Sequence, residues 1–158
     1  MKTRFVVIAL MAVCFALSAV AASSQTQAER EFKRITDDMR ARMNTMQPYQ
    51  YIDYSEKQLQ DFIKRFPKSP EAGKAQFLIG RLYSSIGDNA RAAEALKKYM
   101  DAPGEKAPDD LAQAKFVLAS SYVALARYDE AETLLRDVSN SGVAVDPRSV
   151  QAASPEQK

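Results

Sequence analysis

The side chains that could support catalysis are few, and their spacing does not form a catalytic site. Carboxylates are paired at Asp37-Asp38 and at Asp109-Asp110, and carboxylates can act in general acid–base chemistry. Neighbours in sequence do not face each other on a helix, however. Asp109 and Asp110 follow Pro108, and negative charge in a first helical turn is stabilising without a further role. Serine and lysine could form a hydrolase pair, but no spacing singles one out.

Residue types that most enzymes need are missing from most of the chain. There is no histidine, and the only cysteine, Cys14, lies in an apolar N-terminal stretch. The rest of the chain therefore offers no thiol nucleophile, disulfide, Cys/His zinc site or histidine base. The five glycines are isolated, so no phosphate-binding loop is expected. The sequence predicts a protein that is not an enzyme and binds no cofactor or metal.

Residues 1–22 predict a signal peptide. Lys2 and Arg4 precede an uncharged apolar stretch that ends in small residues. Cleavage after Ala21 or Ala22 would leave a periplasmic or secreted protein. The alternative is an uncleaved inner-membrane anchor, because the uncharged stretch just reaches the length of a membrane span.

The mature chain is electrically balanced. Without Lys2 and Arg4, the 22 basic residues become 20 and match the 20 acidic residues. No nucleic-acid partner is expected from this charge, and membrane contact is expected only through the N-terminal segment.

An internal repeat organises the middle of the chain. Each of two units contains two helical patterns, and Gly87-Asp88 breaks the run in the first unit. A single offset between the two units, which we call the repeat register, aligns five pairs of identical residues. It pairs Ala75 with Ala114, Phe77 with Phe116, Tyr83 with Tyr122, Ala92 with Ala131 and Leu96 with Leu135.

These spacings resemble the tetratricopeptide repeat (TPR) family. The motifs are Ile79-Gly80-x-x-Tyr83 with Ala92-x-x-x-Leu96, and Leu118-Ala119-x-x-Tyr122 with Ala131-x-x-x-Leu135. The resemblance implies an all-α array of antiparallel helix pairs, about two and a half repeats, in a short right-handed superhelix. We expect small side chains where paired helices cross, at Gly80, Ala92, Ala119 and Ala131.

The flanking segments extend this organisation. Residues Ser55 to Phe66 predict the second helix of an earlier unit, and Ser69 and Pro70 predict the start of the next helix. The junction Phe66-Pro67-Lys68-Ser69-Pro70 is similar to one in periplasmic TPR proteins of the outer-membrane-assembly and Tol-Pal-associated kind. The expected segments are a signal peptide (1–22), an N-terminal helix (23–50), a TPR-like domain (51–140) and a disordered tail (141–158).

The N-terminal helix carries an apolar stripe from Ala28 to Met46. We expect either the degenerate first helix of the earlier unit or a separate strut that packs or pairs. Methionines in such a stripe usually belong to a core, and an adaptable binding surface is the alternative.

The resemblance also implies a binding groove along the first helix of each pair. Phe77 and Phe116 would grip an apolar side chain of a peptide, and Lys74 and Arg81 would meet its carboxylates. Packing of both phenylalanines against neighbouring helices is the alternative. The implied groove residues are Lys74, Phe77, Arg81, Ser84 and Ser85 in one unit, and Gln113, Phe116, Ser120, Val123 and Ala124 in the next.

The sequence thus favours an exported, non-enzymatic adaptor or scaffold that binds a protein or peptide partner in the bacterial envelope, with a role in outer-membrane or envelope biogenesis. The alternative is a structural homo-oligomer that pairs through the N-terminal helix or an exposed terminal repeat.

Overall fold

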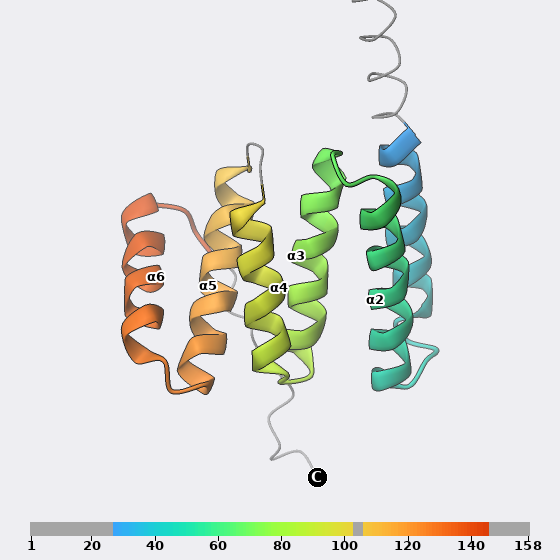
Figure 1. The fold of residues 1–158 in the computed structure, drawn as a ribbon. Helices are drawn as coiled ribbons and strands as arrows, with labels where there is room; N and C mark the ends of the chain where they lie inside the picture. Colours follow the sequence, from blue (N-terminus) through green and yellow to red (C-terminus); the bar gives the residue numbers. More distant parts are fainter. Residues whose placement is uncertain (1–26, 103–105, 146–158) are drawn as a thin grey trace, which may run out of the picture.

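The protein is an array of helix pairs. The computed structural model describes residues 27–102 and 106–145, and all regular structure in these ranges is helical. Three antiparallel pairs stand side by side in a row (Figure 1). A first helix over residues 27–42 pairs with α2, α3 pairs with α4, and α5 pairs with α6. The other bounds are Pro48–Arg65 for α2, Pro70–Ser85 for α3, Asn89–Asp101 for α4, Pro108–Ala124 for α5 and Tyr128–Ser141 for α6.

Proline and capping side chains fix where the helices begin. Pro48, Pro70 and Pro108 each occupy the first turn of a helix, where the missing proline N–H leaves no hydrogen bond unmade. The Ser69 hydroxyl accepts a hydrogen bond from the Ala72 N–H at 3.2 Å, and the Asp88 carboxylate accepts one from the Arg91 N–H at 3.1 Å. The predicted start of α3 at Ser69-Pro70 is confirmed.

The first pair differs from the prediction in its boundaries. The first helix ends at residue 42, before Met46 is reached, and α2 begins at Pro48 rather than at Ser55. Pro48 holds Gln47 in an extended conformation, which separates the two helices. The expected segment boundary between residues 50 and 51 therefore falls inside α2.

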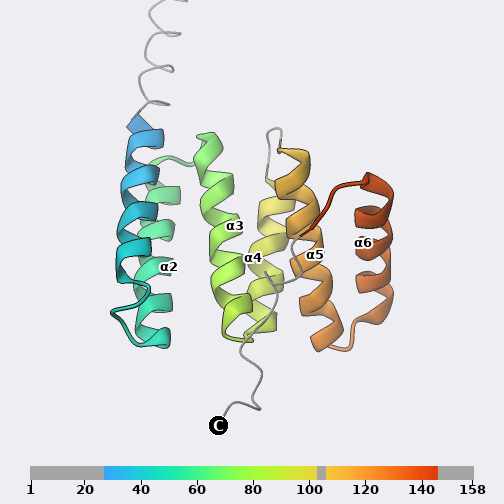
Figure 2. The same ribbon diagram turned by 180° about the vertical axis from the view of Figure 1, so that it is seen from behind.

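The first helix is the first member of a pair and not a separate strut. Its Ile35 and Met39 are buried in one cluster with Ile52, Leu59 and Phe62 of α2, and the two helices lie side by side from behind (Figure 2). The Phe32 and Phe62 ring centroids are 5.5 Å apart. Only part of the apolar stripe belongs to this core, because Met43 lies beyond the end of the helix and is 55% exposed.

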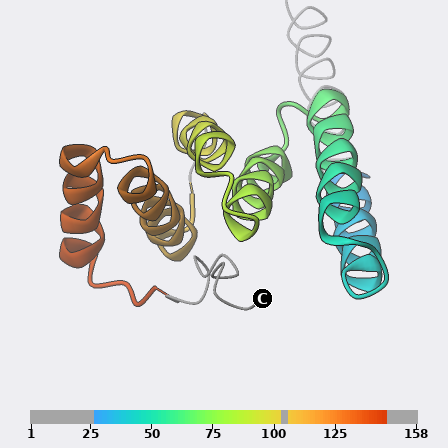
Figure 3. The same cartoon turned by 90° about the horizontal axis from the view of Figure 1, so that it is seen from below.

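Small residues allow the members of each later pair to approach closely. A Cβ atom at Gly80 would lie 2.6 Å from Leu96 Cγ across the α3–α4 crossing. Ala92, Ala119 and Ala131 are at most 2% exposed. The four predicted crossing positions therefore lie in the packed interior. The view from below shows the two helices of each pair next to each other (Figure 3).

The turns inside the second and third pairs are equivalent. Gly87 has φ 75°, and Ala126, its partner in the repeat register, has φ 58°. Arg127 N–H donates to Tyr122 O at 2.8 Å, as Asp88 N–H does to Tyr83 O at 3.0 Å. The turns of the two units thus have the same backbone geometry, as the sequence repeat predicts.

None of the described helices is both long and apolar enough to cross a membrane. The expected signal or anchor segment lies outside the described residues, as does nearly all of the expected tail. Residues 142–145, which follow α6, are not helical.

Candidate interaction surface

The exposed side of α3 carries two cations that have no carboxylate partner in the part of the chain that the structure describes. Lys74 and Arg81 are both exposed and lie two helical turns apart, so they share one side of the helix. Neither forms an ion pair with any residue in the described ranges, whereas most other arginines there do. The only acidic residue of α3 is Glu71 in its first turn. The middle of α3 is therefore a cationic surface.

Phe77 and Ser84 do not line an open groove. Phe77 is 9% exposed, and its ring centroid lies 5.3 Å from that of Tyr99 in α4. The Arg81 guanidinium carbon lies over the same ring, 5.9 Å from its centroid. Ser84 is 5% exposed. Both side chains belong to the packed interior, and for Phe77 the packing alternative holds because α4 supplies an aromatic partner at Tyr99.

The corresponding side of α5 is more open. Val123 is 47% exposed, and Phe116 and Ser120 are half-buried. The Ser120 hydroxyl donates to the Phe116 carbonyl at 3.0 Å. In the repeat register Phe116 has Val138 where Phe77 has Tyr99, so it lacks the ring partner that buries Phe77.

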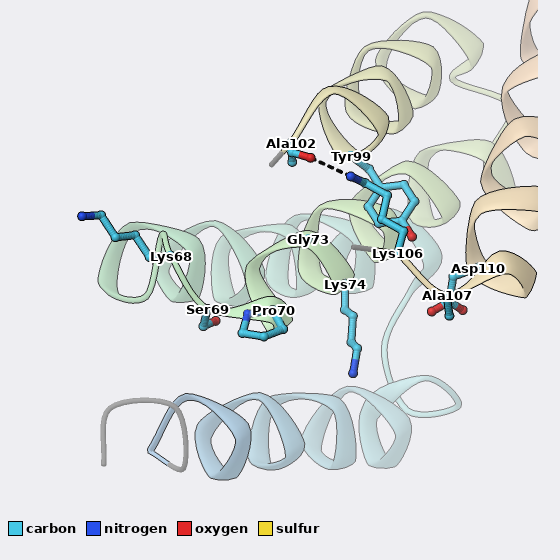
Figure 4. A pocket seen from close by; sticks show the side chains of 10 residues that line it. All are labelled: Lys68, Ser69, Pro70, Gly73, Lys74, Tyr99, Ala102, Lys106, Ala107 and Asp110. Carbon is cyan, nitrogen blue, oxygen red and sulfur yellow. Dashed lines mark hydrogen bonds between the residues drawn. The ribbon is translucent and has the colours of Figure 1, made fainter. Parts of the chain in front are cut away.

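A cavity of about 320 Å³ lies at the N-terminal end of the cationic surface, between α3, α4 and α5. Lys68, Lys74, Tyr99, Lys106 and Asp110 contribute to its walls. Lys106 Nζ donates to the Ala102 carbonyl at 2.6 Å and lies 5.6 Å from the Tyr99 ring centroid. The side chains of Lys68 and Lys74 point away from it in different directions (Figure 4). The lysines do not converge on one point, so the cavity extends the cationic surface and is not a compact anion site.

The loop and α4 residues around this cavity were missed from sequence. Lys106 lies between the end of α4 at Asp101 and the start of α5 at Pro108, in a segment whose sequence carries no periodic signal. Tyr99 fits the helical pattern of α4 as one more apolar residue. Its contact with Phe77 joins two different helices, so spacing within α4 could not reveal the ring pair.

The α3–α4 pair is similar in sequence to a known family of repeats. Residues 73–103 match the family model of the tetratricopeptide repeat. The matched segment runs from the first turns of α3 through α4. No curated protein and no solved structure gives a significant match to the chain.

The match and the internal repeat together support a TPR-like array. The family model covers the second pair, and the repeat register extends the pattern to α5 and α6. TPR proteins are typically non-enzymatic scaffolds, and their repeats generally mediate binding of protein partners.

The tyrosines of the repeat motif bind neighbouring helices together. The Tyr83 hydroxyl donates to the Glu56 carboxylate of α2 and accepts from Arg91 Nη1 of α4 at 3.2 Å. Burial, and then the hydrogen bond to Glu56, raise the pKa of Tyr83 to about 12. Tyr83 thus remains a neutral donor that links three helices. The Arg91 guanidinium also lies over the Tyr83 ring, with its carbon 4.3 Å from the ring centroid, and the Arg127 guanidinium lies over the counterpart Tyr122 in the same way, at 4.0 Å.

Within residues 27–102 and 106–145, no three His, Cys, Asp or Glu side chains are grouped so that they could hold a metal ion. The arrangement that the described residues do offer is a charged helical surface on a packed helical scaffold, which suits recognition of a polypeptide.

Proposed function

We propose that this protein is an exported adaptor of the bacterial envelope that binds a carboxylate-bearing segment of a protein partner along α3. The observation that carries the proposal is the pair of exposed cations Lys74 and Arg81, which form no ion pair within the described part of the chain, on one side of a helix that matches the TPR model. Export is supported by the signal-like residues 1–22. A role in outer-membrane or envelope biogenesis is supported by the Phe66-to-Pro70 junction.

Electrostatics supports a protein partner with acidic side chains. Lys74 and Arg81 have no carboxylate partner among the described residues, so an incoming carboxylate gains attraction without displacing an existing ion pair. The α3 backbone beneath them is already ordered by its packing, so the side chains are what binding has to order at this site. Phe77 supports the site from beneath Arg81 and does not itself contact a partner in this conformation.

The experiment is a charge reversal with a matched control. Envelope extracts are passed over the wild-type mature protein and over the Lys74→Glu and Arg81→Glu variants, with Lys57→Glu as control. Lys57 is an exposed α2 cation that also has no ion pair among the described residues, so its reversal changes net charge equally. We expect both α3 variants to lose a partner that the control retains. Equal recovery by all variants would reject the α3 surface.

The alternative function is a homo-oligomer, and packing within the first pair limits the surfaces through which two copies could pair. Ile35 and Met39 of the first helix are buried against α2, so this part of the stripe is not free to pair with a second copy. Pairing through a terminal repeat remains as the alternative. Light scattering across a concentration series tests it, because a monomer at all concentrations would remove it.

A further inference from the structure

The side of α5 that corresponds to the cationic surface of α3 is uncharged. In the repeat register, Gln113 and Ser120 take the places that the two cations have on α3. Phe116 and Val123 lie on the same side of α5, seven residues apart. Phe116 is half-buried and Val123 is 47% exposed. This side of α5 is therefore neutral and partly apolar.

The two sides adjoin each other. Helix α5 contacts α3 directly as well as α4, and Phe77, which lies beneath Arg81, shares a buried cluster with Ala114 of α5. Equivalent sides of consecutive first helices in a repeat array face nearly the same direction. A row of two cations on α3 therefore lies next to a row of two apolar side chains on α5. We call these four residues the two-row surface: Lys74, Arg81, Phe116 and Val123.

We propose that the two-row surface docks an α-helix of the partner protein that carries two carboxylates seven residues apart and, beside them, two apolar side chains seven residues apart. The carboxylates meet Lys74 and Arg81, and the apolar side chains meet Phe116 and Val123. This inference rests on the proposed binding of a carboxylate-bearing segment along α3. It adds the conformation of that segment, the spacing of its contact residues and a second contact helix, α5.

The spacing within each row favours a helix. Both rows separate their members by seven residues, which is about 10.5 Å along a helix axis. A partner helix that runs alongside α3 and α5 presents its own residues with the same spacing. An extended segment places side chains on one edge about 6.7 Å or about 13 Å apart, and neither distance matches. The Val123 side chain is stiff, and the Arg81 guanidinium lies over the Phe77 ring, so these positions adjust little.

Charge complementarity determines the sign of the partner row that faces α3. Neither Lys74 nor Arg81 forms an ion pair with another residue of the described ranges, so an incoming carboxylate displaces no existing partner. The apolar row of α5 adds contact area that charge alone does not supply. The partner is therefore distinguished from other acidic segments by apolar residues beside its carboxylates.

A second copy of this chain does not offer such a helix. Carboxylates seven residues apart on one described helix occur three times, and at least one member of each pair already forms an ion pair. The pairs are Glu31 and Asp38 in the first helix, Glu94 and Asp101 in α4, and Glu130 and Asp137 in α6. Residues 146–158 contain two carboxylate side chains, Asp146 and Glu156, and these are ten residues apart. We therefore assign the surface to a helix of another protein.

The test uses three synthetic peptides of about 20 residues on an alanine-rich background, all with the same net charge. The matched peptide has two glutamates seven residues apart and two leucines seven residues apart, offset by three residues so that the rows are adjacent on a helix. The shifted peptide has one glutamate moved to the opposite side of the helix. The proline peptide is the matched peptide with a central proline, which breaks the helix. Fluorescence anisotropy measures their binding to the full mature chain.

We expect wild type to bind the matched peptide about tenfold more tightly than the shifted or the proline peptide, because each of these loses contacts to one row. Arg81→Glu should weaken binding of the matched peptide about tenfold and Val123→Ser about fivefold. The controls are Lys57→Glu for charge and Tyr49→Ser for an exposed apolar residue, since Tyr49 is 71% exposed at the start of α2. Both should bind the matched peptide as wild type does. Circular dichroism melting checks that each variant is folded.

Equal binding of all three peptides to wild type would overturn the inference, and so would unchanged binding of the matched peptide to Val123→Ser. If Arg81→Glu still weakens all three peptides, α3 binds carboxylates as proposed, and only the helical partner and the α5 contact are wrong. If Arg81→Glu weakens none of them, the proposed binding along α3 fails as well. A wild-type dimer that Val123→Ser dissociates would identify a second copy as the occupant and would also overturn the inference.

Discussion

At the scale of single residues, backbone conformation and side-chain size explain most of the repeat. Gly87 and Ala126 hold equivalent turns with positive φ, and Gly80 lies where a Cβ would overlap Leu96. The ion pairs beside the two turns have opposite order, since an aspartate precedes its arginine in the first and an arginine precedes its glutamate in the second. In both repeats an arginine still covers the motif tyrosine. The stacking of an arginine on the motif tyrosine is thus the same in both repeats, although the order of the acidic and basic residues is reversed.

The turn makes a reciprocal prediction. A left-handed conformation costs a residue with a Cβ about 1–2 kcal/mol, and glycine avoids this cost but loses more entropy on folding. We expect Ala126→Gly to raise the free energy of unfolding by about 0.5–1 kcal/mol. Gly87→Ala should lower it by about 1 kcal/mol, because no atom lies within 4 Å of the added Cβ and only the backbone is affected. Urea titrations measure both, and a loss of stability in Ala126→Gly would contradict the interpretation.

The α3–α4 crossing makes a second prediction. In Gly80→Ala the new Cβ would lie 2.6 Å from Leu96 Cγ, and Leu96 is completely buried. Overpacking costs about 1–3 kcal/mol, whereas replacing glycine by alanine in a helix gains about 1 kcal/mol in helix propensity. We therefore expect the free energy of unfolding to fall by about 1–2 kcal/mol. In the control, Gly73→Ala, the Cβ would lie 3.8 Å from Tyr99 Cε2, an ordinary contact. That variant should be neutral or more stable; an equal loss in both would reject close packing at Gly80.

At the scale of elements, side-chain networks hold one pair to the next. Tyr83 of α3 bonds Glu56 of α2 and Arg91 of α4, and the clusters on either side share α3 and α4. Within the first pair, Glu31 of the first helix hydrogen-bonds Arg34 and, across to α2, Arg65. These bonds lower the pKa of Glu31 to about 2. Contacts between pairs, and not the pairs alone, make the array one unit.

The Tyr83 bond predicts a stability difference at alkaline pH. The pKa of Tyr83 is raised from 10.0 to about 12 in the folded protein, so the folded state holds the proton more tightly than the unfolded state. This contribution is complete below pH 10 and is lost as the pH rises from 10 to 12. We expect Tyr83→Phe to cost about 1.5 kcal/mol at neutral pH and progressively less above pH 10. Urea titrations of both proteins at several pH values test this, and a pH-independent difference would contradict it.

At the scale of the whole molecule, periodicity is enough to predict the architecture. Short stretches of sequence are enough to recognise the identical residues of the repeat register and the small residues at Gly80 and Ala131. They predict helix pairs, turns and crossings that the structure contains. The right-handed superhelical sense stays a prediction.

The site is less predictable because exposure depends on what lies beside each residue in space. Phe77 and Phe116 occupy the same repeat position, yet Tyr99 buries only the first. Lys74 and Arg81 are exposed as expected, but the sequence could not show that neither forms an ion pair with another of the described residues.

The start of α2 was missed for a similar reason. Between Pro48 and Ser55, Ile52 and the partly buried Tyr51 pack into the core, and two neighbouring residues do not by themselves mark a helix face. The structure reveals their role because it places Ile52 in one cluster with Ile35 and Met39 of the first helix.

The most direct test of the adaptor account is site-specific photocrosslinking in the intact envelope. A photoreactive amino acid replaces Ser85, an exposed residue one helical turn from Arg81 on α3, in one variant and Lys57 on α2 in another, so that Lys74 and Arg81 stay in place. We predict that the residue at position 85 forms a discrete crosslink to one protein, and that position 57 does not. If neither position gives a crosslink, or if both give the same products, α3 is not the partner-binding surface and the central claim fails.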